Sequence, residues 1–569
     1  MKTVLCLAMI LQLCMAGDSY ALTMTYSSCI QSYRTDLAAN KVYVRMNGIY
    51  GFVRANNAGG AARTLTVTVE NIDPDYVTLS EGTLTARGTN TLTFTLNVSA
   101  GGTHTVYINP WYLTNDIYFI AWSDNQDGDS YFKNKLVPKA ALINAIFTVS
   151  GGDVNKATPP TIGGAGTAGT YPYPNDYMRD FQFLNYLSLI EDYPTPIMEV
   201  PGNHDLSRGG WLTKSDARYD SGQVLWRKYL SPTYYSFNAG SAHFSMCNFH
   251  YDMPNWTSAW GGNQDMGYFQ INAADSAGAK FKTWLTNDLT AAQTADCRIL
   301  VSHHALSMFI PDYHTKDTLK NLVAAKNVNY MIHGHAHSYS TGTNEAGINY
   351  LITGDAQKPN PGFSLVHING SAVTQQHMYA DNLSLSVTHH YPNNGTVTRD
   401  SATLVCSGYN LPFMRVKFKM SNSYASYKAK DAATGTAIPA YSHQFADYTV
   451  VYVETAINNG ATKNIVVEPI TPLAPLHAAS VMVTNKNEMD NSITLSPNPA
   501  TGNITLRLPV KDNREYRIVL YDLSGRALRT LKSNNRTVVI QRGSLQPGVY
   551  MVKISSGNNN AITKKVVFE

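Results

Sequence analysis

Potential metal ligands recur directly after apolar runs of the chain. At five places such a run ends in a short polar motif, and together the motifs supply carboxylates, a carboxamide and several imidazoles. The residues are Asp124, Asp153, Asn203, His204, Asp205, His303, His335 and His337. Carboxylate and amide oxygens suit hard cations, and imidazole nitrogens suit borderline ones. One divalent ion would not need so many donors, so the set favours two ions that share a bridging carboxylate.

Such a pair of ions would hydrolyse phosphate esters. Paired ions about 3.5–4 Å apart clamp a phosphate and lower the pKa of a bridging water, so that hydroxide attacks in line. His204 would be free to stabilise the transition state or to protonate the leaving oxygen. Asp205 would fix the tautomer of that histidine. A lone Asp after a strand is most often a turn or a helix N-cap, so the ordered set carries the prediction and no single member does.

Buried strands must position these residues. The apolar runs cover residues 117–122, 145–149, 196–200, 298–301 and 328–332. Their continuity is typical of strands buried on both faces. Stretches with helical periodicity, such as residues 177–191 and 279–289, lie between them. Because open α/β sheets bind ligands at the carboxyl ends of their strands, the pattern predicts one layered α/β domain with its site along one sheet edge.

The motifs resemble those of the calcineurin-like metallophosphoesterases over about residues 115–369. That family has Asp-x-His, Gly-Asp, Gly-Asn-His-Asp/Glu, a single His and Gly-His-x-His, in this order. The matching motifs here are Asp124-Asn125-Gln126, Gly152-Asp153, Gly202-Asn203-His204-Asp205, His303 and Gly334-His335-Ala336-His337. The resemblance implies that residues 113–375 form a four-layer α/β/β/α domain, in which a sandwich of two β-sheets is flanked by helices.

The resemblance also implies roles for single residues in a dinuclear site that hydrolyses phosphate mono- or diesters. It implies that Asp124 and His337 bind the first metal ion. It implies that the second ion is bound by Asn203, His303 and His335. Asp153 would bridge the two ions, His204 would be the acid or electrostatic group, and Asp205 would be its partner.

Gln126 departs from the family pattern, which usually has His at this position. As a ligand through its carbonyl oxygen it would favour Mn²⁺ or Mg²⁺ over Zn²⁺ or Fe²⁺. Alternatively, Gln126 only hydrogen-bonds a metal-bound water. Lys156 stands where purple acid phosphatases have a Tyr, so we do not expect a ferric enzyme of that type. Arg208, three residues after Asp205, would contact a phosphate oxygen or be an ordinary surface arginine.

The flanking segments indicate export and additional β-domains. Residues 1–21 have the charged start, apolar middle and small-residue end of a signal peptide, and the apolar run is too short for a transmembrane helix. Period-two alternation predicts a β-sandwich over residues 22–112, with a scaffold or binding role, and a β-rich domain over residues 376–475. A formal net charge of +4 over 569 residues does not indicate a nucleic-acid partner. The cysteines outside the signal leave zero, one or two disulfides open.

Residues 488–569 carry short strands and motifs such as Leu495-Ser496-Pro497-Asn498-Pro499. They resemble the type IX secretion C-terminal sorting domain of Bacteroidetes. This implies passage through the periplasm, transport by the type IX secretion machinery, and then release or attachment at the outer-membrane surface. A carbohydrate-binding or adhesion module is the alternative. Two function classes follow for the chain: a secreted metal-dependent phosphoesterase, or a catalytically silent surface binding protein that retains the fold, with Gln126 as the first sign of decay.

Overall fold

The computed structural model divides into two compact units, Met1–Ile470 and Thr471–Glu569. The residues that it describes are 22–32, 35–126, 128–155, 175–206, 221–249, 277–308, 315–470, 494–496, 500–508, 515–521, 527–535, 537–543, 545, 548–556 and 560–568.

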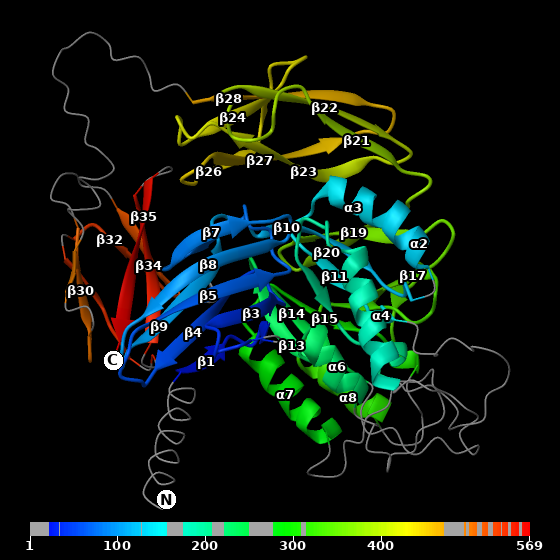
Figure 1. The fold of residues 1–569 in the computed structure, drawn as a ribbon, viewed down its shortest axis with the longest axis horizontal. Coiled ribbons are helices and arrows are strands. Elements are labelled where there is room, and N and C mark those ends of the chain that lie inside the picture. The colour runs from blue at the N-terminus through cyan, green and yellow to red at the C-terminus, as the bar shows by residue number, and fades with distance from the viewer. Residues whose placement is uncertain are drawn as a thin grey trace, which may run out of the picture. The chain divides into compact units, whose positions relative to one another are not determined.

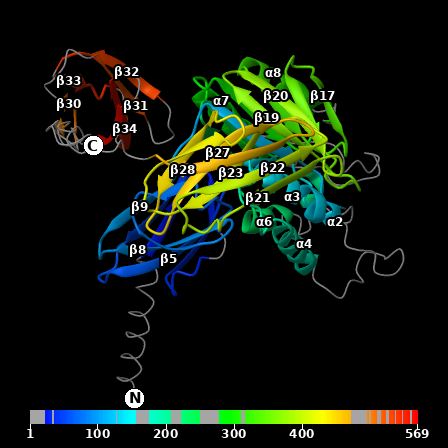
Figure 2. The same cartoon turned by 90° about the horizontal axis from the view of Figure 1, so that it is seen from above.

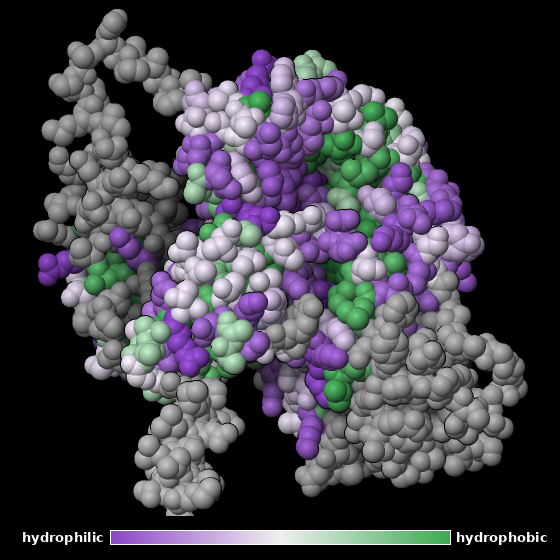
Figure 3. All heavy atoms as spheres, viewed as in Figure 1, coloured by the Kyte–Doolittle hydropathy of each residue, from purple (hydrophilic) through white to green (hydrophobic). Residues whose placement is uncertain are grey.

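The first unit begins with two sheets that enclose a core of their own (Figure 1). One sheet has the strand order β1 (Leu22–Tyr26), β4 (Gly51–Asn57), β9 (Thr103–Pro110) and β6 (Val77–Leu79). The other has the order β2 (Ile30–Ser32), β3 (Lys41–Met46), β5 (Arg63–Glu70), β8 (Thr91–Val98) and β7 (Thr83–Arg87). Alternation along β5 buries Leu65, Val67 and Val69 and leaves threonines outside. The outer face of β5 and β8 is pale in Figure 3 because threonine has intermediate hydropathy.

Two further sheets lie in the middle of this unit and pack against each other. One has the order β12 (Ile197–Glu199), β11 (Thr148–Ser150), β10 (Asp116–Trp122), β19 (Gly362–Asn369) and β20 (Ala372–Tyr379). The other has the order β13 (Tyr235–Ala239), β14 (Ala242–Cys247), β15 (Cys297–Ser302), β16 (Tyr330–His333), β18 (Asn349–Thr353) and β17 (Tyr339–Thr343). Phe119, Val149 and Ile299 share one buried cluster that joins the two sheets.

Helices pack on these central sheets. Buried residues of α3 (Val137–Ile143), α4 (Asn175–Leu189) and α6 (Ser221–Tyr229) form a cluster with Ile120 and Trp122 of β10. Buried residues of α7 (Ala277–Ala291) and α8 (Thr315–Ala325) form another with Leu300 of β15 and Met331 of β16. The shorter helical segments are α2 (Asp129–Tyr131), the π-helical η1 (Phe132–Leu136), α5 (Asn203–Leu206) and the 3₁₀ turn η3 (Leu306–Met308). Alternate side chains of β10 therefore face either a helix or the opposite sheet.

The first unit ends in another pair of sheets, drawn in yellow in Figure 2. One has the order β21 (Ser384–His389), β22 (Asp400–Ser407), β28 (Thr462–Pro469), β24 (Tyr427–Asp431) and β25 (Ala437–Ile438). The other has the order β23 (Leu411–Met420), β27 (Thr449–Ile457) and β26 (Ala440–Gln444). Their apolar residues, such as Phe418 and Val451, belong to the cluster that contains α3 and Trp122, so this pair shares an apolar core with the central region.

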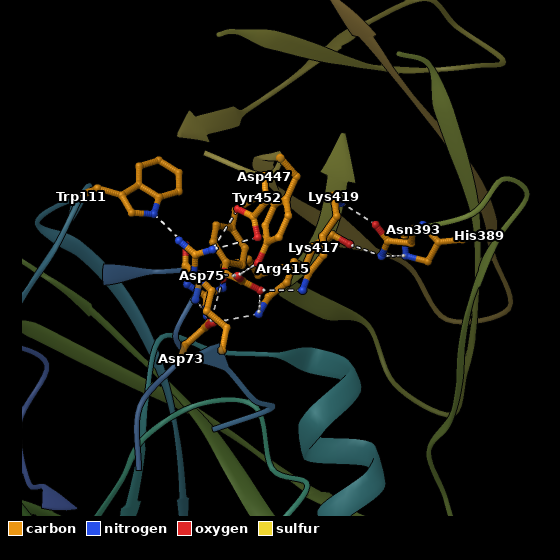
Figure 4. A network of polar contacts seen from close by, with 12 residues as sticks. Asp73, Asp75, Trp111, His389, Asn393, Arg415, Lys417, Lys419, Asp447 and Tyr452 are labelled. Carbon is orange, nitrogen blue, oxygen red and sulfur yellow. Dashed lines mark hydrogen bonds and ion pairs between the residues drawn. The ribbon is translucent and has the colours of Figure 1, made fainter. Parts of the chain in front are cut away.

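Within the first unit, a buried ionic network also joins the N-terminal pair of sheets to the pair that contains β23 (Figure 4). Lys417 Nζ on β23 lies 2.8 Å from Oδ1 of Asp73 and 3.1 Å from Oδ2 of Asp75, both in the loop after β5. Arg415 Nη2, also on β23, lies 3.4 Å from Oδ2 of Asp73. Nε of the same arginine donates to the backbone oxygen of Asn144, which ends α3, at 3.0 Å. The three regions of the first unit thus meet at one set of paired charges.

The described part of the second unit contains two sheets. One has the order β29 (Thr494–Ser496), β30 (Ile504–Arg507) and β33 (Thr537–Ile540). The other has the order β32 (Ala527–Ser533), β31 (Tyr516–Tyr521), β34 (Gly548–Ser556) and β35 (Asn560–Phe568). Ile504, Ile518 and Val552 belong to its own buried core.

Cys29, Cys247, Cys297 and Cys406 are buried free thiols, so of the alternatives left open by the sequence the structure has zero disulfides among these four residues. Within the described ranges, none of the helices combines the length and apolar character that a membrane span requires.

Candidate metal centre

Parallel strands bring the polar motifs together. β10, β11 and β12 run in the same direction, and so do β15 and β16 of the facing sheet. Their carboxyl ends therefore lie at one edge of the two sheets. The residues that follow these ends are Asp124, Asp153, Asn203, His303, His335 and His337. The motifs that were predicted to supply metal ligands thus converge on one place.

The backbone is unusual where it leaves these strands. Asp124, Asp153, His335 and His337 all have positive φ, between 51° and 70°. Residues with a Cβ rarely adopt this conformation, and it recurs at functional sites, where the surrounding structure holds it. Gly202 is required by close approach, because a Cβ there would clash with the carboxylate of Asp153. These turns aim polar side chains into the space between the strand ends.

The first group of potential ligands consists of Asp124, Asp153 and His337, whose ligand atoms all lie within 4.8 Å of one another. Nε2 of His337 is 3.6 Å from Oδ1 of Asp124. Gln126 joins this group, because its Nε2 lies 3.2 Å from Nε2 of His337 and 3.5 Å from Oδ2 of Asp153. Its Oε1 is buried without a hydrogen-bond partner among the described residues. A half-turn of the amide would exchange the two atoms and direct the oxygen to the other ligands.

The second group consists of His303, His304 and His335. Nδ1 of His335 lies 3.1 Å from Oδ1 of Asn203 and 3.2 Å from Nε2 of His303, so Asn203 belongs to the group as well. Nε2 of His303 is in turn 3.0 Å from Oδ2 of Asp153. Asp153 therefore touches both groups. His304 was not among the ligands predicted from the sequence, where its only signal was its position directly after His303.

Hydrogen bonds around the ligands fix their orientation. Nδ1 of His303 donates to the backbone oxygen of Gly151 at 2.7 Å, which leaves Nε2 available as a ligand. The backbone N–H of His335 donates to both carboxylate oxygens of Asp124, at 3.0 and 2.9 Å. The backbone N–H of His204 donates to Oδ1 of Asp153 at 2.9 Å. The two aspartates are thus held in place before any ion binds.

Asp205 makes different contacts from those that we expected. Its carboxylate accepts hydrogen bonds from the backbone N–H groups of Gly202, Asp153, Val154 and Asn155, at 2.8 to 3.0 Å. These bonds tie the loop after β11 to the loop after β12. Nδ1 of His204 is buried and has no hydrogen-bond partner within the described part of the chain. The contacts of Asp205 therefore indicate that it holds the two loops together. They do not indicate that it orients the ring of His204. Arg208 and Lys156 lie outside the described residues.

Comparison with known families agrees with this geometry. Residues 105–339 match the family model described as calcineurin-like phosphoesterase. This region is a calcineurin-like phosphoesterase domain. Residues 494–569 match the model described as secretion system C-terminal sorting domain. Both resemblances found in the sequence are confirmed by these matches.

Comparison with individual proteins adds little to the phosphoesterase assignment. No curated protein matches the chain. A dimetal phosphatase from Danio rerio has 13% identity and a TM-score of 0.31, over 46% of this chain and 98% of that chain. A conserved uncharacterised protein from Streptococcus pneumoniae, described as a predicted phosphoesterase, has 14% identity and a TM-score of 0.22, over 47% of this chain and 91% of that chain.

Burial and neighbouring charges shift the pKa values of several groups at the candidate site. Burial raises the pKa of Asp124 to about 7. Burial acts in the same direction on Asp153, but the charge of His303 outweighs it and holds the pKa of Asp153 at about 2. Burial lowers the pKa of His303, but the charge of Asp153 outweighs it and raises that pKa to about 9. Without an ion, Asp153 and protonated His303 form an ion pair, and a divalent cation would replace that proton.

The donor set fits divalent cations. Carboxylate oxygens, a carboxamide and imidazole nitrogens are the ligands that Mn²⁺, Zn²⁺ and Fe²⁺ accept, and within each group of aspartates and histidines the ligand atoms lie within 4.8 Å of one another. The unpartnered Oε1 of Gln126 is one more buried oxygen that an ion would satisfy. The match of residues 105–339 to the calcineurin-like phosphoesterase model implies divalent ions as well.

Proposed function

We propose that the chain is a secreted, metal-dependent phosphoesterase that hydrolyses phosphate mono- or diesters at a dinuclear centre. One observation carries this proposal: Asp153 belongs to the group with Asp124 and His337, whose ligand atoms lie within 4.8 Å of one another, and its Oδ2 also lies 3.0 Å from Nε2 of His303 in the other group. A single buried carboxylate between two sets of donors is the arrangement that two ions with a shared ligand need.

We assign the ligands from these contacts. Asp124, Gln126 and His337 would hold the first ion, and Asn203, His303 and His335 the second, with Asp153 shared. Bound ions would neutralise the phosphate oxygens and supply a water of lowered pKa. The oxygen of Gln126 is a harder donor than the imidazole that is usual there, which favours Mn²⁺ or Mg²⁺. His304 lies beside His335, with ring centroids 4.4 Å apart, and would support the second site.

His204 is our candidate for the group that acts on the leaving oxygen. Its backbone is fixed to Asp153, while its side chain is only partly buried. It is thus held next to the shared ligand without being a member of either donor group. An imidazole in such a position can donate a proton to the leaving oxygen or stabilise the charge that develops on it.

We also propose the layering of the central domain, the export route of the chain and its catalytic nature. The clusters of buried side chains between the two central sheets, and between each sheet and its helices, support the α/β/β/α layering of residues 113–375. The sorting domain implies handling by the secretion machinery and a final location outside the cell or at its surface. We propose that residues 1–21 direct the chain to the periplasm first. The set of donors, which departs from the family pattern only at Gln126, argues for catalysis over a silent binding protein.

Hydrolysis by the purified protein tests this function. We expect activity on p-nitrophenyl phosphate or on its bis-ester that EDTA abolishes and Mn²⁺ restores. Comparison of the two substrates decides between monoesterase and diesterase activity. Binding of Mn²⁺ without hydrolysis of either ester, of nucleotides, of sugar phosphates or of phospholipid head groups would favour the silent binding protein.

A further inference from the structure

The strand that leads into the metal centre lies at an edge of its sheet. β12 has only three residues, and among the described strands it pairs with β11 alone. Asn203, a potential ligand, follows Glu199 at the end of β12 by only four residues. Hydrogen bonds hold this connection in place. The backbone N–H of Val200 donates to the backbone oxygen of Ser150, and that of Gly202 donates to Oδ2 of Asp205. The position of β12 therefore sets the position of Asn203 and His204.

The free edge of β12 is completed by a side chain from the N-terminal sheets. Oδ1 of Asn71, directly after β5, accepts the backbone N–H of Ile197 at 2.8 Å. Nδ2 of Asn71 donates to the backbone oxygen of Ile197 at 2.7 Å and to that of Met46 at 2.6 Å. Both main-chain groups of Ile197 that face away from β11 are thus paired, as they would be by a neighbouring strand. Asn71 adopts a φ of 59° to do so.

A buried ion pair acts at the other end of the same short strand. Nη2 of Arg45 on β3 lies 2.8 Å from Oε1 of Glu199, and the two side chains are 5% and 0% exposed. Burial raises the pKa of Glu199, and the charge of Arg45 opposes this rise. The backbone oxygen of Glu199 accepts a hydrogen bond from the hydroxyl of Tyr235 at 3.0 Å. Both ends of β12 are therefore fixed by groups that lie outside its own sheet.

We propose that the N-terminal β-domain is a structural part of the metal centre, in which Asn71 and Arg45 are positioning residues that set β12 and thereby Asn203 and His204. This inference rests on the proposed function, and it replaces the separate scaffold or binding role that the sequence suggested for these strands. Both residues act on the ligands through β12. Groups that orient metal ligands from outside the coordination sphere typically change affinity or turnover by about 10–100-fold when they are removed.

The test compares two buried asparagines of the N-terminal sheets in the full-length protein. Asn71→Asp keeps the acceptor for Ile197 and loses both donated hydrogen bonds. Asn57→Asp is the matched control, since Nδ2 of Asn57 also donates to backbone oxygens, those of Ala61 and Ser99, at 2.7 and 3.2 Å, but within its own domain. The measurements are Mn²⁺ affinity and stoichiometry by calorimetry, kcat and KM on p-nitrophenyl phosphate, and the melting temperature.

We expect Asn71→Asp to lose about tenfold or more in Mn²⁺ affinity for one ion, with a matching fall in kcat. Asn57→Asp should keep the wild-type Mn²⁺ affinity and kcat, even if its melting temperature falls as much as that of Asn71→Asp or more. Wild-type affinity in Asn71→Asp, or an equal loss in Asn57→Asp, would overturn the proposal. Failure of the proposed function looks different: the wild-type protein would bind Mn²⁺ and hydrolyse no ester, and the comparison of affinities would still decide about Asn71.

A charge-neutral pair provides a second test if Asn71→Asp does not fold. Arg45→Gln alone leaves the carboxylate of Glu199 buried and unpaired, whereas Arg45→Gln combined with Glu199→Gln leaves two neutral groups that can hydrogen-bond. We expect Mn²⁺ affinity to fall in the single variant and to recover in the double variant. Equal affinity in the wild type and in Arg45→Gln would contradict the positioning role.

Discussion

Asp153 is the residue on which the site depends, because it is buried between two sets of donors and its pKa is held at about 2. The sequence identified it through the motif Gly152-Asp153, but the motif says nothing of its neighbours. Its ligand atom lies within 4.8 Å of those of Asp124 and His337, and its Oδ2 lies 3.0 Å from Nε2 of His303, so it is within reach of both groups of potential ligands.

Removal of His204 should separate chemistry from metal binding. We expect His204→Ala to lose about 10²–10⁴-fold in kcat, because general acid catalysis contributes on this scale. Mn²⁺ content should stay at the wild-type value, because the backbone N–H that bonds Asp153 remains. Steady-state kinetics and metal analysis of the same sample check both statements. Full activity of His204→Ala would exclude the residue from the mechanism.

Substitution of Gln126 tests whether it is a direct ligand. We expect Gln126→Ala to lower Mn²⁺ affinity at one of two sites, because an amide next to His337 is removed together with its buried, unpartnered oxygen. Gln126→His, which restores the usual family residue, should raise the affinity for Zn²⁺ relative to Mn²⁺. Competition titrations with the two ions provide the measurement. Unchanged ion selectivity and affinity in both variants would mean that Gln126 contacts only water.

The convergence of the polar motifs at one sheet edge was predictable from the sequence, and the surroundings of the individual residues were not. Asp124, Asn203 and His335 follow apolar runs, and parallel strands bring such positions together whatever the details of packing. The role of Asp205 was not predictable, because three of its four partners are backbone amides 50 to 52 residues earlier in the chain. Asn71 carried no signal at all, since its partner Ile197 lies 126 residues away.

At the scale of elements, the junction between the first and last pairs of sheets should respond to pH. Burial would raise the pKa of Asp75, but the charges of Lys417 and Lys419 outweigh it and lower that pKa. A group whose pKa is lower in the folded state stabilises the protein above its unfolded pKa, about 4, and loses this contribution as the pH falls through the folded pKa.

We therefore expect the melting temperature of the wild type to fall more steeply below about pH 4 than that of Asp75→Asn, which has no proton to gain. At pH 7 the variant should be the less stable of the two. Thermal unfolding of both proteins between acidic and neutral pH provides the comparison. Parallel curves for the two proteins would show that this carboxylate does not contribute to stability through its charge.

The same junction explains why the regions expected at residues 22–112, 113–375 and 376–475 form one unit up to residue 470. The alternation of β5 and β23 was visible in the sequence, and both strands are present. The sequence did not indicate that Arg415 on β23 reaches the backbone of Asn144 and the side chain of Asp73. Because a buried charge is costly unless it is paired, such contacts bind the regions to each other. The sequence alternation suggested separate β-sandwiches on either side of the central domain. In the structure these segments and the central domain belong to one compact unit that ends at residue 470.

At the scale of the whole molecule, the sorting domain and the phosphoesterase domain belong to different units. We expect a chain that lacks residues 471–569 to keep its hydrolytic activity and to stay in the periplasm, because the signal for outer-membrane transport is removed. Fractionation of cells that produce either form, with the activity measured in each fraction, tests this. Activity of the truncated chain in the medium, at the wild-type level and without cell lysis, would contradict the role of the sorting domain.

The most direct test of the account is a crystal structure of the Mn²⁺-loaded protein, with anomalous scattering measured at the manganese edge. We predict two anomalous peaks about 3.5–4 Å apart on either side of the Asp153 carboxylate. The first should be coordinated by Asp124 and His337, and the second by Asn203, His303 and His335. A single peak, or peaks from which Asp153 is absent as a ligand, would contradict the dinuclear centre.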